Sequence, residues 1–212
     1  MRLPPTSSAE ATIARYYSGK LARHGATPRG VDWTCAASQA LRFDRLLQVI
    51  ELPTFSLNDI GCGYGALLGH LDACRGDTSV DYLGVDLSKA MVESAIDLWR
   101  HRPGAAFAEA PCALRRADYS VASGIFNVNL DQPLDRWEGF VERTLVDMAD
   151  ASRVGLAVNF MRLRRSSTAY PSPLYRTSPR RWRDFLATLG WRTRLIEGYG
   201  LGEFTLLATR AQ

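Results

Sequence analysis

Two aspartates and three glycines at regular spacing are the residues of this chain best suited to ligand chemistry. Asp59 precedes Gly61, Gly63 and Gly65, which occupy alternate positions, and Asp86 ends the next apolar run. Glycine permits a tight turn and leaves no Cβ between the backbone and a ligand. A carboxylate about twenty residues after such a turn can accept hydrogen bonds from ribose hydroxyls. The spacing therefore predicts a nucleotide-binding site.

The segments around these residues predict the elements that position them. A short apolar run at 55–60 can form a buried strand that stops at the first glycine. The next segment has an apolar face with helical spacing, and a second strand is expected at 80–85. The helical face consists of Leu67, Leu68, Leu71 and Cys74. Strand, glycine turn, helix and strand are typical of a βαβ unit.

The glycine spacing alone leaves the kind of nucleotide open. Gly61-x-Gly63-x-x-Ala66 also satisfies the fingerprint of dinucleotide-binding proteins. Two features favour S-adenosylmethionine (SAM) instead. Asp59 lies two residues before the first glycine, where a carboxylate suits the ammonium of an amino acid and serves no purpose for a pyrophosphate. Asp86 leads directly into a helix, which is expected to begin beside the adenine.

These residues resemble motifs I and II of class I SAM-dependent methyltransferases. The matching segments are Asp59-x-Gly61-x-Gly63-x-Gly65 and Gly84-Val85-Asp86-Leu87-Ser88. The resemblance covers about residues 52–210 and implies an α/β fold with a single doubly wound, mostly parallel sheet. It also implies a C-terminal antiparallel strand pair, an N-terminal helical cap, SAM as cofactor and methyl transfer as activity. One domain is expected over 1–212, with 1–51 as a helical lid segment and 52–210 as the Rossmann-like core.

The resemblance implies cofactor contacts at the ends of the first four strands. A third strand is expected at 105–108, ending near an acidic residue that the family usually places beside the adenine amino group. A fourth is expected at 118–123. The expected cofactor-binding residues are Asp59, Gly61, Cys62, Gly63, Gly65, Asp86, Leu87, Met91, Ala108, Glu109, Ala110 and Ser123, with Tyr17 and Arg42 from the lid segment.

The segment before the first strand is expected to cover the cofactor and shape the acceptor pocket, as it often does in this family. Residues 1–15 are interpreted as a loosely held terminus, and Ser38 as the N-cap of an amphipathic helix. The expected substrate-binding residues are Trp33, Asn127, Asn159, Arg162 and Tyr175.

The sulfonium of SAM is already a good leaving group, so orientation matters more than proton abstraction. Placing acceptor and methyl in line supplies about 7–11 kcal/mol, whereas a general base adds about 3–5 kcal/mol. His24 and Tyr17 are the expected catalytic residues if a base is needed, and Glu109 is a further candidate.

The remaining elements are marked by apolar runs and helix-capping residues. A near-continuous apolar run at 154–160 predicts a strand covered on both faces. Ser178 and Pro179 predict the start of a last helix, which Gly190 closes. Two strands are expected at 191–197 and 203–209, and these form the antiparallel pair.

The charge of the chain is unevenly distributed. The net charge is +4, but residues 151–212 hold eleven arginines against three acidic residues. This excess of arginine leaves two classes of methyl acceptor open, a small molecule and RNA. The small molecule would be anionic if Arg162, Arg165 or Arg176 binds it. The small molecule is favoured by the scarcity of lysine and by the loop at 166–177, whose tyrosines and prolines suit a lid over a small ligand. The methyl group is expected to go to an oxygen or nitrogen atom of that molecule. An RNA or protein methyltransferase is the first alternative.

Two alternatives belong to other functional classes. A non-catalytic SAM-binding module would keep residues 59–86 and lose only the acceptor pocket. An NAD(P)-dependent oxidoreductase would share the first half of the fold, but the chain offers no convincing catalytic Tyr-x-x-x-Lys motif.

The four scattered cysteines contain no CxxC pair, so neither a disulfide framework nor a metal site is expected. No long apolar run or signal peptide is apparent, so a cytoplasmic protein that does not bind membranes is expected, with its oligomeric state open.

Overall fold

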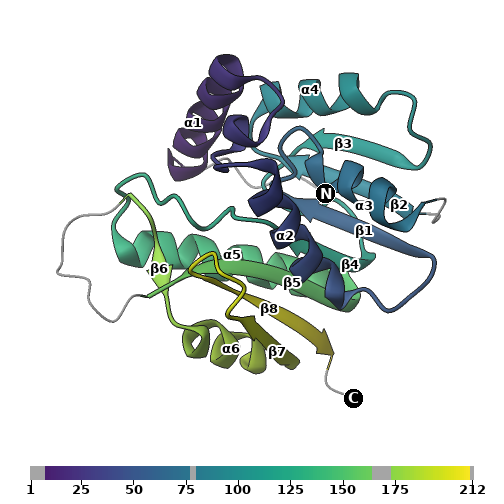
Figure 1. Cartoon of the computed structure of the whole chain (residues 1–212). Helices are drawn as coiled ribbons and strands as arrows, with labels where there is room; N and C mark the ends of the chain where they lie inside the picture. The colour runs from purple at the N-terminus through teal and green to yellow at the C-terminus, as the bar shows by residue number, and fades with distance from the viewer. Residues whose placement is uncertain (1–7, 77–79, 164–172, 211–212) are drawn as a thin grey trace.

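The computed structural model describes residues 8–76, 80–163 and 173–210. Its centre is an eight-stranded sheet with the order β3-β2-β1-β4-β5-β8-β7, and the short β6 pairs with β5 (Figure 1). The strands β1 to β5 pair in parallel, whereas β8 is antiparallel to both β5 and β7. The doubly wound sheet with a C-terminal antiparallel pair is therefore confirmed.

The strand bounds follow the apolar runs closely. The strands are β1 Phe55–Ile60, β2 Val80–Asp86, β3 Ala105–Glu109, β4 Ala117–Ala122, β5 Ser152–Arg162, β6 Arg176–Thr177, β7 Trp191–Glu197 and β8 Glu203–Arg210. The two-residue β6 has too short a pattern to be predicted from sequence.

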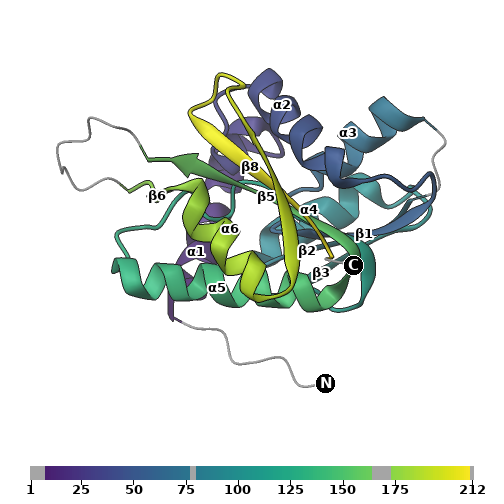
Figure 2. The same ribbon diagram turned by 90° about the horizontal axis from the view of Figure 1, so that it is seen from below.

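The helices cover both faces of the sheet. They are α1 Ser8–His24, α2 Ala36–Leu46, α3 Ala66–Arg75, α4 Lys89–Trp99, α5 Leu134–Ala151 and α6 Pro179–Thr188, with 3-10 turns η1 Pro28–Val31 and η2 Leu47–Val49. One buried cluster packs α5 and α6 against the sheet, and a second packs α2 and α3 against it. Figure 2 shows these two helix pairs on opposite faces.

The predicted N-terminal segment needs two corrections. Residues 8–15 were expected to be loosely held, but they form the first half of α1, because Ala9, Ile13 and Tyr17 at four-residue spacing turn toward the protein. Ser38 is not an N-cap, since α2 begins at Ala36 after Cys35, and the Ser38 hydroxyl donates to the Cys35 carbonyl at 2.9 Å.

Other predicted helix starts are confirmed. The Ser88 Oγ accepts a hydrogen bond from the Met91 N–H at 3.2 Å and starts α4 directly after β2. Ser178 caps α6 in the same way, with Pro179 at its first position. Both caps are hydrogen bonds between residues three apart, so the local sequence can indicate them, although the same signal misplaced the start of α2 at Ser38.

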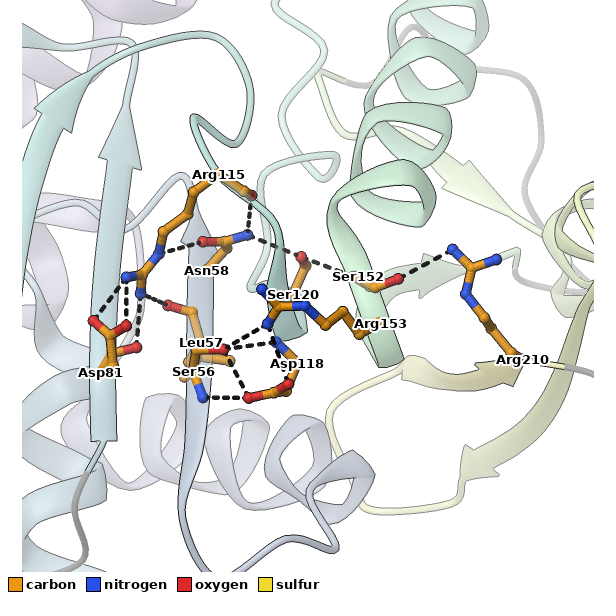
Figure 3. A network of polar contacts seen from close by, with 10 residues as sticks. All are labelled: Ser56, Leu57, Asn58, Asp81, Arg115, Asp118, Ser120, Ser152, Arg153 and Arg210. Carbon is orange, nitrogen blue, oxygen red and sulfur yellow. Dashed lines mark hydrogen bonds and ion pairs between the residues drawn. The ribbon is translucent and has the colours of Figure 1, made fainter.

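A polar network holds the amino ends of the central strands together (Figure 3). The buried Asn58 donates to the Arg115 carbonyl at 3.0 Å, and Arg115 Nη1 pairs with Asp81 at 2.7 Å. Nearby, Asp118 Oδ2 accepts from both the backbone N–H and the hydroxyl of Ser56. These contacts join β1, β2 and β4 at their amino ends and leave the carboxyl edge free for ligands.

No helix within the described residues combines the length and apolar character that a membrane crossing requires.

Candidate active site

The glycine turn between β1 and α3 is left-handed at each of its three glycines. The φ angles are +71° at Gly61, +56° at Gly63 and +80° at Gly65. A Cβ on Gly61 would lie 2.2 Å from the Ile125 side chain, and one on Gly65 would lie 2.5 Å from the Trp99 indole. Gly61 and Gly65 are therefore required by close packing within the protein as well as by backbone conformation.

Asp86 ties the end of β2 to this turn. Its Oδ2 accepts a hydrogen bond from the Gly63 N–H at 2.9 Å, and its Oδ1 accepts one from the Ser88 N–H at 2.8 Å. Burial raises the pKa of Asp86, while the backbone N–H groups of Ser88, Gly63 and Leu87 oppose that rise. Each carboxylate oxygen retains lone pairs for further donors, such as a pair of ribose hydroxyls.

Asp59 is enclosed behind the glycine turn, where it is 2% exposed. The Tyr82 hydroxyl donates to its Oδ2 at 2.6 Å. Burial raises the pKa of Asp59 to about 7, and this hydrogen bond offsets part of that rise. A cation placed near Asp59 would therefore favour its ionised form.

A cavity of about 310 Å³ opens at the carboxyl ends of β1, β2 and β4. The helices α1 and α2 and the turn η1 contribute its other walls through Tyr17, Val31 and Gln39. Among the described residues, its lining includes no histidine or lysine and consists mostly of apolar side chains. Enclosed, largely apolar cavities with a few polar groups at strand ends are typical binding sites for small ligands.

A buried charge pair forms part of one wall of this cavity. The Arg42 guanidinium binds the Glu203 carboxylate, with Nε 2.9 Å from Oε2, and lies 3.9 Å from the Trp33 ring centroid. Asn159 Nδ2 donates to the same carboxylate at 2.9 Å, and its Oδ1 accepts the Gly124 N–H at 2.7 Å. The network neutralises the arginine and anchors the loop that follows β4.

The other side of the cavity is formed by α1 and η1. Burial raises the pKa of Tyr17, and the nearby carboxylates of Asp32 and Asp86 add to the rise, so the phenol stays protonated at neutral pH. Both Tyr16 and Lys20 bind the Asp32 carboxylate, which links α1 to the end of η1.

The cavity brings together thirteen of the residues that the sequence proposed for the site. They are Tyr17, Trp33, Arg42, Asp59, Gly61, Cys62, Gly63, Asp86, Leu87, Met91, Ala110, Ser123 and Asn127.

Seven other proposed residues do not line the cavity. His24 borders a shallow surface groove, Arg162 pairs with Glu197 on the surface, and the Tyr175 hydroxyl donates to Glu138. The remaining four are Gly65, Ala108, Glu109 and Asn159. Arg165 lies outside the described residues.

Sequence reasoning missed several lining residues. Ile13 could have been found from its four-residue spacing to Tyr17 on α1, and Glu203 from its position as an acidic residue opening an apolar strand. The others carry no comparable local signal and are Val31, Asp32, Thr34, Gln39, Phe43, Ile60, Tyr64, Ala66, Leu67, Pro111, Gly124, Ile125, Val128, Phe140, Thr144, Met161 and Leu174.

Comparison with known proteins shows what the chain as a whole is similar to. No family model matches the chain. A Mycobacterium tuberculosis (strain ATCC 25618 / H37Rv) protein named "Putative methyltransferase Rv1506c" is 41% identical over 165 residues, which is 74% of this chain and 94% of the relative.

Two solved structures share the fold. Magnesium protoporphyrin IX methyltransferase (ChlM) from Synechocystis PCC 6803 with bound SAM has a TM-score of 0.66 at 15% identity, covering 98% of this chain and 100% of that one. Human N-acetylserotonin methyltransferase in complex with SAM has a TM-score of 0.68 at 16% identity, covering 99% of this chain and 61% of that one.

At these identities the structures establish the fold, and the relative at 41% identity establishes the family. With the Asp59-to-Gly65 turn and Asp86 placed at one cavity, the chain belongs to the class I SAM-dependent methyltransferases.

Proposed function

We propose that the chain transfers a methyl group from SAM to an oxygen or nitrogen atom of a neutral small molecule. The main support for this proposal is the apolar cavity, which is lined by residues from the strand ends and from the N-terminal helices. A polynucleotide acceptor would need an open basic track beside such a cavity, and the one cation of the described lining, Arg42, is paired with Glu203. Two solved structures with the same fold are named for small molecules, magnesium protoporphyrin IX and N-acetylserotonin, which supports a small-molecule acceptor but not its charge.

The residues present suit SAM in three places. Asp86 retains acceptor capacity beyond its two backbone donors and would bind the ribose hydroxyls. A Cβ on Gly63 would reach within 3.0 Å of Val31, so only glycine keeps this part of the cavity open. The Asp59 carboxylate would lie toward the ammonium, and Met91 and Leu87 would offer an apolar surface to the adenine. When bound, SAM supplies an activated methyl group.

The chain itself contributes orientation more than acid–base chemistry. Tyr17 keeps its proton at neutral pH, so its hydroxyl acts as a hydrogen-bond donor to bound molecules and does not abstract a proton. The other two proposed bases, His24 and Glu109, are absent from the cavity lining. Holding the two reactants in line is worth about 7–11 kcal/mol, which exceeds what a base contributes.

The charges around the cavity favour a neutral acceptor. Arg42, the one cation among the described lining residues, is neutralised by Glu203. Arg162 is paired with Glu197, and its backbone carbonyl accepts a hydrogen bond from Arg176; neither arginine lines the cavity. An anionic acceptor in the cavity would be repelled by the carboxylates of Asp59 and Asp86, and the described lining offers no unpaired cation to compensate for that repulsion.

Thermal unfolding with SAM, its demethylated product S-adenosylhomocysteine (SAH), or NAD tests the cofactor site. A ligand at a hundred times its Kd stabilises by about 2.7 kcal/mol, which raises the Tm of a domain of this size by about 5–10 °C. We expect this shift with SAM and SAH and none with NAD. A shift with NAD alone would contradict the proposal.

Radiolabelled SAM tests the acceptor class. After incubation with a cell extract, label is expected in the low-molecular-mass fraction and not in RNA or protein. RNA methylation together with binding that weakens by orders of magnitude between about 50 and 200 mM salt would show a polynucleotide acceptor instead.

A further inference from the structure

Two residues of the cavity wall each carry a buried polar side-chain atom that has no hydrogen-bond partner within the described residues. Five such atoms occur in that part of the chain, on Arg45, Ser123, Asn127, Asn129 and Trp182, and those of Ser123 and Asn127 belong to residues that line the cavity. Asn127 is 4% exposed, and its unpartnered atom is the amide nitrogen Nδ2. Buried N–H groups in native proteins are nearly always paired, so this donor points to a bound partner.

The orientation of the Asn127 side chain is determined by its own contacts. Its Oδ1 accepts the Met161 N–H at 3.2 Å, so the other end of the amide must be the NH₂ group. Its backbone carbonyl accepts the Tyr175 N–H at 2.9 Å, and its backbone N–H donates to the Gly124 carbonyl at 3.1 Å. Asn159 holds Gly124 in turn. The donor is therefore held in place before any ligand arrives.

This donor lies on the acceptor side of the cavity. The carboxylates assigned to the cofactor lie at the carboxyl ends of β1 and β2. Asn127 instead follows β4 and bonds to Met161 in β5, on the opposite side of β4 from β1. An ideal Cβ on Gly124 would lie 3.6 Å from Asn127 Nδ2 and 2.3 Å from the Trp33 indole. Asn127 Nδ2 therefore lies near the Trp33 indole. Trp33 and Ile125 give this part of the wall an apolar surface.

We propose that Asn127 Nδ2 donates a hydrogen bond to an oxygen atom of the methyl acceptor. The acceptor is then a neutral, largely apolar molecule that carries a carbonyl, ether or hydroxyl oxygen, and Asn127 selects for that oxygen. This inference rests on the proposed function, because it assumes that SAM occupies the β1–β2 side of the same cavity.

A pair of probes that differ only in the oxygen tests the selection. Acetophenone and α-methylstyrene have nearly the same planar shape, with a carbonyl oxygen in the first and a methylene group in the second. The affinity of each is measured on the SAH-saturated protein by ligand-observed NMR. The ratio of the two affinities is then compared between the wild type and variants, so that the different hydration of the probes cancels.

Asn127→Leu removes the amide and should reduce the preference for acetophenone by about 5- to 150-fold. Asn127→Asp keeps an oxygen for the Met161 N–H but replaces the donor with an acceptor, so it should reduce the preference even if the leucine variant folds poorly. Asn129→Leu is the matched control. Asn129 is half-buried, its buried Oδ1 has no partner within the described residues, and it does not line the cavity, so the ratio should not change.

An unchanged ratio in both Asn127 variants, or no binding of either probe to the SAH-saturated wild type, would overturn the inference. Loss of SAH affinity in Asn127→Asp with the ratio retained would place Asn127 on the cofactor side and would also overturn it. Failure of the wild type to bind SAH would instead overturn the proposed function, and the inference with it.

Discussion

The Arg42 guanidinium and the Glu203 carboxylate form a buried ion pair between α2 and β8. Their side chains are 8% and 2% exposed, and they lie 161 residues apart in the sequence. Arg42 Nη1 also donates to the Ser38 carbonyl at 2.7 Å, and Asn159 donates to Glu203. The pair therefore fixes the helix over the cavity relative to the strand behind it.

Glu203→Gln should destabilise the fold by about 3–5 kcal/mol, because the change leaves a buried arginine without its counter-charge. The free energy of unfolding in urea measures this loss. Asp184→Asn is the control, since its pair with Arg180 is highly exposed and should contribute less than about 1 kcal/mol. Equal, small losses in both variants would show that the buried pair does not hold α2 in place.

Asp86→Ala should weaken SAH binding by about 10- to 150-fold, because a carboxylate that accepts hydroxyl donors contributes about 1.5–3 kcal/mol. Calorimetric titration measures the affinity. Asp81→Ala changes the same residue type at the amino end of the same strand, where Asp81 pairs with Arg115, and should leave the affinity unchanged. An Asp86 variant within threefold of the wild type would remove this carboxylate from the site.

The raised pKa of Asp59 predicts that stability falls as pH rises. The unfolded carboxyl has a pKa near 3.9, whereas the folded value is about 7, so between these values the native state binds a proton that the unfolded state lacks. The stabilisation is complete below about pH 4 and is lost as pH rises through 7.

Asp59→Asn should remove this pH dependence. Relative to the variant, the wild type should lose stability between pH 5 and pH 8, as measured by urea unfolding at both values. Groups that titrate in both proteins contribute equally to the two free energies of unfolding, so their contributions cancel when the variant is subtracted from the wild type. A constant difference would show that the Asp59 pKa is not raised.

SAH binding should release a proton near pH 7 if the ammonium of the ligand lies beside Asp59, because a cation favours the ionised carboxylate. Titration calorimetry in two buffers with different enthalpies of ionisation measures the proton count. The release should disappear in Asp59→Asn. Equal apparent enthalpies in both buffers for the wild type would place the ammonium elsewhere.

Gly63→Val should abolish SAH binding while the chain still folds, because its Cβ would reach 3.0 Å from Val31 at a φ of +56°. Gly76→Val has a similar φ of +59° but open space around the added Cβ, so it isolates the cost of backbone strain. The shift in Tm on adding SAH distinguishes the two variants, because it should disappear in Gly63→Val and remain in Gly76→Val. Normal binding by Gly63→Val would mean that the cofactor lies away from this turn.

The sequence by itself was sufficient for the parts of the molecule whose signals are local. The glycine turn after β1, the acidic end of β2 and the capping serines each depend on residues within a few positions of one another. Parallel strands also end at a common edge, which is why Asp59 and Asp86 were expected to lie together, and both line one cavity.

The acceptor wall was decided only by the tertiary structure. Nothing near Arg42 in the sequence indicates that Glu203 neutralises it. Nothing near Asn127 shows that the Met161 N–H binds its side-chain oxygen, or that its nitrogen finds no partner among the described residues. On α1, Tyr17 and His24 seemed equally able to serve as a base, but only Tyr17 lines the cavity, and its burial raises the pKa of the phenol. Charge pairing, burial and pKa arise from groups distant in sequence, so they exist only once the chain has folded.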